Sequence, residues 1–253
     1  MAILKNFLIA VLPFSLFQGP ILQAAEAVCT KRELFLTHTL LKTKRTQDNQ
    51  LFYYRLHLAS TKKLAGKKLK MVVINSFGQP TGHADIWFDQ EEKVWISEGG
   101  QNLPLEEFEP TIGNFSDGEF VDFIVVDEEK HILAGTRLCP KPIECTASDG
   151  AILSLQLLSP GQYAIRGYGF KPNETFSLIS QSEEEVIPSI PLEACAGGTL
   201  TAFTSPYVVG KSYGRASITL IRQDGTELKC SYLWGIPAEK LAAMANKKQK
   251  REV

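Results

Sequence analysis

The stretch YAIRGYGFKPNETFSLISQSEEEV, residues 163–186, decides the fold of the second half of the chain. Gly167 and Gly169 match the first two glycines of the dinucleotide-binding pattern G-x-G-x-x-G, which must open a helix. Pro172 stands where the third glycine belongs and has no N–H to offer a phosphate. Residues 174–180 alternate as a strand and do not form a helix pattern. The stretch therefore predicts a turn between two β-strands and excludes a nucleotide site.

The residues of this turn each have a physical role. Gly169 is free to adopt a positive φ, and Phe170 is placed to plug the end of a β-sandwich. Pro172 and Asn173 then fix a tight turn before the next strand.

The turn resembles the G-x-G-F-x-P-x-E stretch of bacterial immunoglobulin-like domains. The matching residues are Gly167, Gly169, Phe170, Pro172 and Glu174. Residues 198–203 and 205–206 look like a later strand and turn of the same module. The resemblance implies an immunoglobulin-like β-sandwich in an adhesive, scaffold or substrate-binding setting, and it implies no catalytic residues.

Working outward, short strands recur through the rest of the chain. Residues 51–58 alternate with period two, so that Phe52, Tyr54, Leu56 and Leu58 share one face. Polar turns predict two hairpins, one over 84–97 and one over 120–138. The fold class is therefore all-β, with two β-sandwich domains.

The boundary between the two domains is predicted at residues 138–142, where two prolines at alternate positions block strand pairing. We expect an N-terminal β-sandwich over 28–139 and an immunoglobulin-like domain over 143–236. A short helix opening at Pro237 and a basic tail complete the chain over 237–253. The tail is expected to be a frayed end, with binding to an anionic surface as the alternative.

Residues 1–27 have the order of a signal peptide: Lys5, an apolar run over 7–17 and an A-x-A site at 25–27. The apolar run is too short to cross a bilayer, and no later stretch reaches the required length. We therefore expect an exported protein of the periplasm or cell surface that does not span the membrane.

Five cysteines in an exported chain predict structural disulfides. Cys29 opens the first domain and Cys139 closes it, so these two are expected to pair. In the second domain we expect Cys195 to pair with Cys230, which leaves Cys145 unpaired. The alternative is a Cys145–Cys230 pair.

No pattern predicts catalysis or a cofactor. A formal net charge of −1 gives no general attraction to nucleic acid. His83 and Asp85 share one side of a strand, where both are able to reach a metal, but two ligands do not make a site. An exported metal-dependent hydrolase is kept as an alternative function.

Trp87 and Trp95 face each other across the hairpin predicted over 84–97. If they point outward, they form an apolar platform for a protein or a glycan; we expect them to point into the core. The function predicted is a non-enzymatic binding or structural module. An assembly chaperone that captures a client strand at an open sheet edge is a further alternative.

Overall fold

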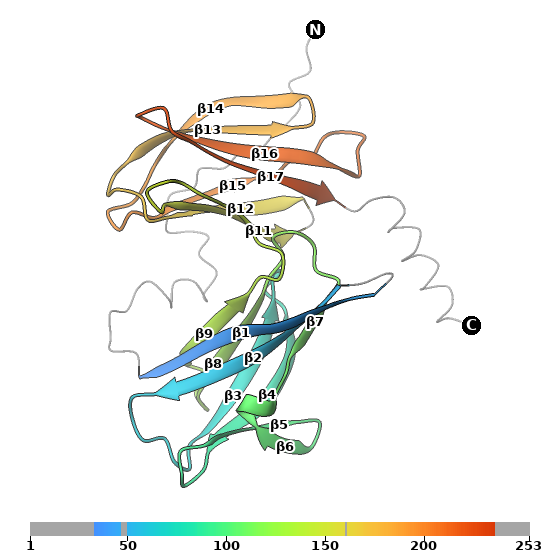
Figure 1. The fold of residues 1–253 in the computed structure, drawn as a ribbon, viewed down its shortest axis with the longest axis vertical. Helices are drawn as coiled ribbons and strands as arrows, with labels where there is room; N and C mark the ends of the chain where they lie inside the picture. The colour runs from blue at the N-terminus through green and yellow to red at the C-terminus, as the bar shows by residue number, and fades with distance from the viewer. Residues whose placement is uncertain (1–32, 47–49, 160, 236–253) are drawn as a thin grey trace, which may run out of the picture. The chain divides into compact units, whose positions relative to one another are not determined.

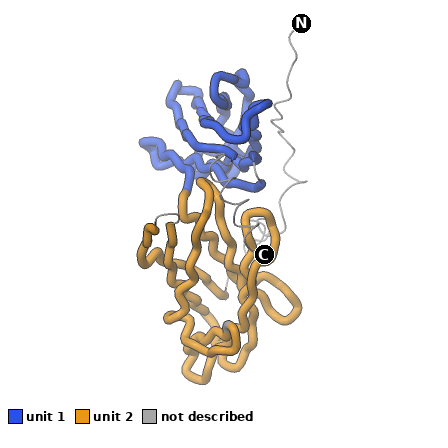
Figure 2. The backbone as a smooth tube through the Cα atoms, turned by 90° about the vertical axis from the view of Figure 1, so that its right-hand side faces the viewer, with its two compact units in different colours: residues 1–12, 142–253 blue, residues 13–141 orange. Residues whose placement is uncertain are grey.

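The computed structural model describes residues 33–46, 50–159 and 161–235. The predicted signal peptide, Cys29 and the helix and tail over 237–253 lie outside these residues. Most of the described residues lie in β-strands, which confirms the all-β prediction, and the only helix among them is the 3-10 turn η1 (Leu105–Glu107). The chain forms two compact units that meet in sequence between Lys141 and Pro142. We call the unit that ends at Lys141 the first unit and the unit that begins at Pro142 the second unit, in chain order; they are unit 2 (orange) and unit 1 (blue) in the key of Figure 2. Within the described residues there is no helix long and apolar enough to cross a membrane.

The first unit is a sandwich of a six-stranded and a three-stranded sheet, both antiparallel (Figure 1). The larger sheet has the order β6 (Gln101–Pro104), β5 (Val94–Glu98), β4 (Pro80–Phe88), β3 (Lys68–Asn75), β8 (Val121–Val126) and β9 (Ile132–Leu138). The smaller sheet has the order β1 (Leu34–Arg45), β2 (Gln50–Ser60) and β7 (Thr111–Gly113).

The core of the first unit follows from the alternation predicted for residues 51–58. Phe52, Tyr54 and Leu56 are buried on one face of β2, while Leu58 is half-buried against the same core. These side chains join Met71 and Ile86 of the larger sheet in one hydrophobic cluster. Removal of these apolar surfaces from water is the main force that holds the two sheets together. The two predicted hairpins are also confirmed, as β4–β5 and β8–β9.

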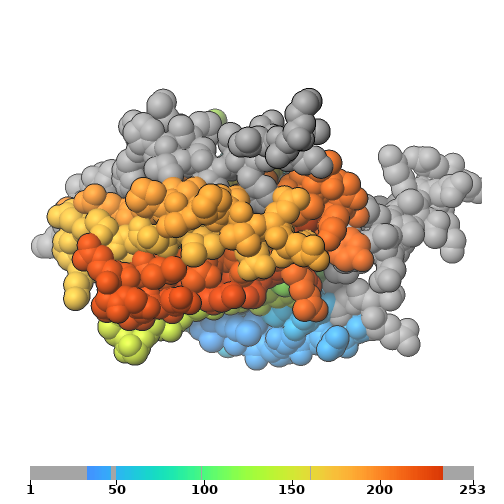
Figure 3. Space-filling model, turned by 90° about the horizontal axis from the view of Figure 1, so that it is seen from above, coloured from blue at the N-terminus to red at the C-terminus, as the bar shows by residue number. Residues whose placement is uncertain are grey.

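The second unit is an immunoglobulin-like sandwich of two four-stranded antiparallel sheets. One sheet has the order β10 (Ile143–Thr146), β11 (Ile152–Ser159), β12 (Gln162–Tyr168) and β15 (Leu200–Thr204). The other has the order β14 (Glu185–Glu193), β13 (Thr175–Ser182), β16 (Tyr213–Arg222) and β17 (Glu227–Gly235). The chain changes sheet between β12 and β13, between β14 and β15, and again before β16. Figure 3 shows the β13–β14 and β16–β17 hairpins side by side on the surface of this unit.

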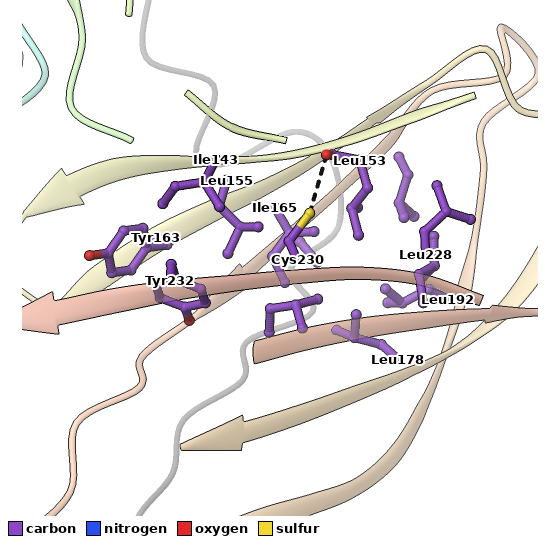
Figure 4. Packing of buried hydrophobic residues seen from close by; sticks show 14 of the residues in the cluster. Ile143, Leu153, Leu155, Tyr163, Ile165, Leu178, Leu192, Leu228, Cys230 and Tyr232 are labelled. Atoms are coloured by element: carbon purple, nitrogen blue, oxygen red, sulfur yellow. Dashed lines mark hydrogen bonds between the residues drawn. The ribbon is translucent and has the colours of Figure 1, made fainter. Parts of the chain in front are cut away.

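The interior of the second unit is filled by alternate residues of both sheets (Figure 4). Leu153 and Ile165 of one sheet and Leu178 of the other are fully buried. The rings of Tyr163 and Tyr232 pack against each other with their centroids 4.7 Å apart. Each inward residue alternates with an outward one, which is the pattern of a two-layer β-sandwich.

The turn that decides the fold has the conformation its residues predict. Gly169 has φ +74°, and Asn173 also has a positive φ. Phe170 is buried at the end of the sandwich, where its ring lies 4.7 Å from that of Phe176. Gly167 lies directly under this ring, and a Cβ there would overlap it. The glycines of the motif therefore give Phe170 room to close the core, and they do not cradle a phosphate.

Candidate binding face

Trp87 and Trp95 lie directly opposite each other on β4 and β5 of the first unit. Their neighbours Ile86 and Ile96 are fully buried in the core between the sheets. Because successive residues of a strand point to opposite faces, both tryptophans project from the outer face of the six-stranded sheet. Each is half-buried, and neither belongs to the core cluster. The prediction that they point into the core is therefore wrong.

The two indole rings form an ordered pair. Their centroids are 6.5 Å apart and their planes differ by 12°. Offset, nearly parallel rings at this spacing attract each other beyond the area they bury. The pair thus offers two aligned aromatic surfaces on one sheet face.

The turn between β4 and β5 holds the ring of Trp95 in place. The Trp95 indole Nε1 donates a hydrogen bond of 2.8 Å to Asp89 Oδ2. The other carboxylate oxygen accepts from the backbone N–H groups of Glu91 and Lys93, each at 2.9 Å. These hydrogen bonds, that of Trp95 first, lower the pKa of Asp89. Lys93 Nζ lies 5.2 Å from the centre of the Trp95 ring, a cation–π contact.

The register of strand pairing places the two tryptophans in a row of cross-strand neighbours that runs from β3 to β6. Lys68 of β3 is opposite Trp87, and Pro104 of β6 is opposite Trp95. The sequence signal that Trp87 points outward is Asp85, which lies two residues before it and therefore on the same strand face. The exposed Lys68 opposite Trp87 agrees with this direction.

A second, polar row runs beside the first on the same face. It consists of Lys70, Asp85, Ser97 and Asn102, which are aligned by strand pairing. Residues two apart on one strand face are separated by roughly 7 Å. An ammonium, a carboxylate, a hydroxyl and an amide therefore lie next to the aromatic pair. We call Lys68, Trp87, Trp95, Pro104 and this polar row the tryptophan face.

The pair predicted as possible metal ligands overlaps this face, because Asp85 belongs to its polar row and His83 lies two residues before it on β4. His83 and Asp85 are both exposed on β4. Their cross-strand neighbours on β3 are Val72 and Lys70, and neither is a third ligand. No cluster of three His, Cys, Asp or Glu side chains suited to a metal occurs among the described residues.

The cysteines of the second unit are placed in two different surroundings. The Cys230 and Cys145 Sγ atoms are 2.8 Å apart, so the structure brings together the two cysteines that were predicted as the alternative pair. Cys195 is exposed, and its Sγ lies 2.9 Å from Thr199 Oγ1. In the first unit, Cys139 Sγ donates to the carbonyl oxygen of Glu119 at 3.4 Å.

Comparison with known proteins gives no family. No protein-family model matches the chain, and no curated protein sequence is significantly similar to it. Among solved structures, a two-domain fibronectin type III segment of chicken tenascin is 9% identical, with 79% of this chain and 98% of that one covered and a TM-score of 0.25. A tetra-tandem repeat from the extending region of a large adhesion protein is 11% identical, covering 81% and 50%, with a TM-score of 0.25.

A DUF3823 family protein from Bacteroides ovatus is 9% identical, covering 81% of this chain and 97% of that one, with a TM-score of 0.22. Overall superposition is low in all three cases. The immunoglobulin-like assignment of the second unit therefore rests on its own strand pairing.

Proposed function

We propose that the protein is an exported, non-enzymatic binding module of the bacterial periplasm or cell surface, and that its tryptophan face binds a glycan. The observation that carries this proposal is the aligned, half-exposed pair of Trp87 and Trp95 on the solvent side of a sheet. Large aromatic surfaces left accessible on an ordered scaffold favour recognition, because they lose little side-chain entropy on binding.

The polar row favours a glycan over an apolar partner. A sugar ring has an apolar C–H face, which suits an indole ring, and a rim of hydroxyls that both donate and accept hydrogen bonds. Asp85 accepts, Lys70 donates, and Asn102 does both. The aromatic row and the polar row thus match the two kinds of surface that one oligosaccharide carries.

Substituting either tryptophan should weaken binding without unfolding the protein. We expect Trp87→Ala and Trp95→Ala each to weaken binding to an oligosaccharide by about tenfold or more, as for an aromatic hot spot. Neutral and acidic oligosaccharides on an array identify the ligand, and calorimetry with that ligand measures the affinity.

Tyr213→Ala is the matched control, because it removes a half-exposed aromatic ring from the second unit. Unchanged affinity in both tryptophan variants would refute the proposed face. If the same variants lose binding to a protein ligand but bind oligosaccharides as wild type does, the face serves protein recognition instead.

Export has its own test. The order of charge, apolar run and small residues over 1–27 supports removal of a leader after Ala27. N-terminal sequencing of protein from the native envelope should start at Val28. A chain that retains Met1 and stays in the cytosol contradicts export but leaves the binding face untouched.

Capture of a client strand is a second candidate. β1 is an edge strand of its sheet and pairs only with β2. Its residues from Thr37 to Arg45 are exposed apart from half-buried Leu41, and no described strand pairs with its outer edge, although His38 contacts β9 through Thr136 Oγ1 at 2.8 Å. The unpaired main-chain groups of this edge suit β-augmentation. A proline placed at Leu40, whose N–H alternates away from β2 toward the outer edge, should then impair client assembly but not oligosaccharide binding.

A further inference from the structure

Cys145 and Cys230 come from opposite sheets of the second unit and meet in its interior. Cys145 lies on β10, the first strand of the unit, and Cys230 lies in the middle of β17, the last. β10 contacts β17 although the two strands belong to different sheets. The Sγ atoms are 2.8 Å apart.

The surroundings of both sulfurs are those of a closed core. Alternation along β17 turns Cys230 inward, between the buried residues Leu228 and Tyr232. Figure 4 shows its sulfur among Leu155 and Ile165, directed toward the Leu153 carbonyl oxygen 3.5 Å away. Cys145 is half-buried against the same cluster and pairs with Leu153 in register. The sulfurs need move by less than about 1 Å to reach the S–S bond length of ~2.05 Å.

We propose that Cys145 and Cys230 form a disulfide that cross-links the first and last strands of the second unit. This bond replaces the predicted Cys195–Cys230 bridge, because the structure places the Cys230 sulfur against Cys145. It joins the two sheets directly and closes most of the unit into one covalent loop, which constrains the unfolded chain.

The chemistry requires a disulfide oxidant such as oxidised glutathione. The Cys145 thiolate attacks one glutathione sulfur, forms a mixed disulfide and releases one glutathione thiolate. The Cys230 thiolate then attacks the Cys145 sulfur and releases the second. The two protein thiols lose two electrons to the oxidant, and their two protons end on the two glutathione thiols.

The difference in exposure between Cys145 and Cys230 sets the order of these two steps. Cys145 is half-buried, whereas Cys230 is buried, so Cys145 is the thiol that meets the oxidant and Cys230 resolves the mixed disulfide. Burial raises the pKa of both thiols, so little thiolate exists at neutral pH. Oxidation of the folded, reduced protein should therefore be slow at pH 7 and accelerate toward pH 9.

Peptide mapping tests the bond. The full chain is refolded with oxidised glutathione, its remaining thiols are alkylated, and it is digested without reductant. We expect one linked peptide pair that carries Cys145 and Cys230. Alkylation of both residues, or a link from Cys230 to any other cysteine, overturns the proposal.

Thermal unfolding gives a second measurement on matched variants. Reductant should lower the Tm of the second-unit transition by at least about 10 °C in wild type and in Cys195→Ser. It should have no such effect in Cys145→Ala, where the bond cannot form. The difference between the two variants removes any contribution of Cys29 and Cys139, which both variants keep. Equal shifts in Cys195→Ser and Cys145→Ala contradict the proposal.

Discussion

Replacing Arg222 with methionine should lower the free energy of unfolding of the second unit by about 3 kcal/mol or more. The Arg222 side chain is only 6% exposed. Its Nε donates to Glu174 Oε1 at 2.6 Å and its Nη2 to Glu174 Oε2 at 3.1 Å, a bidentate pair. Its Nη1 donates to Asp149 Oδ2 at 2.6 Å. Methionine keeps much of the apolar volume but leaves the Glu174 carboxylate, 11% exposed, without its cation.

The position of Arg222 explains the size of this effect. Asp149 lies in the turn between β10 and β11, Glu174 immediately precedes β13, and Arg222 ends β16. The guanidinium carbon also lies 5.8 Å from the centre of the Phe170 ring. One buried cation therefore ties both sheets to the turn that closes the sandwich.

Urea unfolding measures the effect, and Arg215→Met is the control. Arg215 is an exposed residue of the same strand, so its loss should change stability by less than about 0.5 kcal/mol. Adding Glu174→Gln to Arg222→Met should recover part of the lost stability, because the stranded charge is removed. If Arg222→Met unfolds at the same urea concentration as Arg215→Met, the ion pairs of Arg222 do not hold the two sheets to the closing turn.

The same network makes stability depend on pH in a predictable direction. The hydrogen bonds from Arg222 are the largest cause of the lowered pKa of both Glu174 and Asp149. A carboxyl whose pKa is lower in the folded state stabilises it fully above its unfolded pKa, near 4. That stabilisation is lost as pH falls through the folded pKa. The urea midpoint of wild type should therefore drop more steeply below about pH 4 than that of Arg222→Met.

Local patterns were sufficient to predict the strands and the closing turn. The alternation over 51–58 predicts β2 because only a strand places every second residue on one face. Gly169 and Phe170 predict the turn because a positive φ and an apolar plug have few other uses at a strand end. These features depend only on residues that are close in sequence, so they are the same however the sheets are arranged.

Facts that depend on distant partners could not be predicted in this way. The direction of Trp87 is an exception, because Asp85 shares its face whereas Ala84, Ile86 and Phe88 share the other, and this local pattern indicates an exposed tryptophan. The row that joins the two tryptophans to Lys68 and Pro104 depends on the order of strands in the sheet, which no single strand reveals. Likewise, Cys145 and Cys230 are neighbours only because β10 and β17 lie against each other across the sandwich.

Gly198 lies in a tight turn behind the closing phenylalanine, in a left-handed conformation that residues with side chains adopt at a cost. Its φ is +70°, and its N–H donates to the Cys195 carbonyl oxygen at 2.9 Å. Its own carbonyl oxygen accepts from the Phe170 N–H at 3.1 Å. A Cβ on Gly198 would overlap the backbone carbonyl oxygen of Phe170, which no side-chain rotation relieves.

We therefore expect Gly198→Ala to lower the free energy of unfolding by about 3 kcal/mol, from the positive φ and the backbone overlap together. Gly210→Ala separates the two causes, because Gly210 has φ +85° and open space where the Cβ would lie. It should lose only about 1 kcal/mol, the strain of the left-handed conformation. Both values come from urea unfolding of the full chain. Equal losses in the two variants would mean that the turn moves away from Phe170 at little cost. A larger loss in Gly198→Ala than in Gly210→Ala means that the turn is held against Phe170 and that the motif at 167–174 closes the sandwich by backbone contact as well as by its aromatic plug.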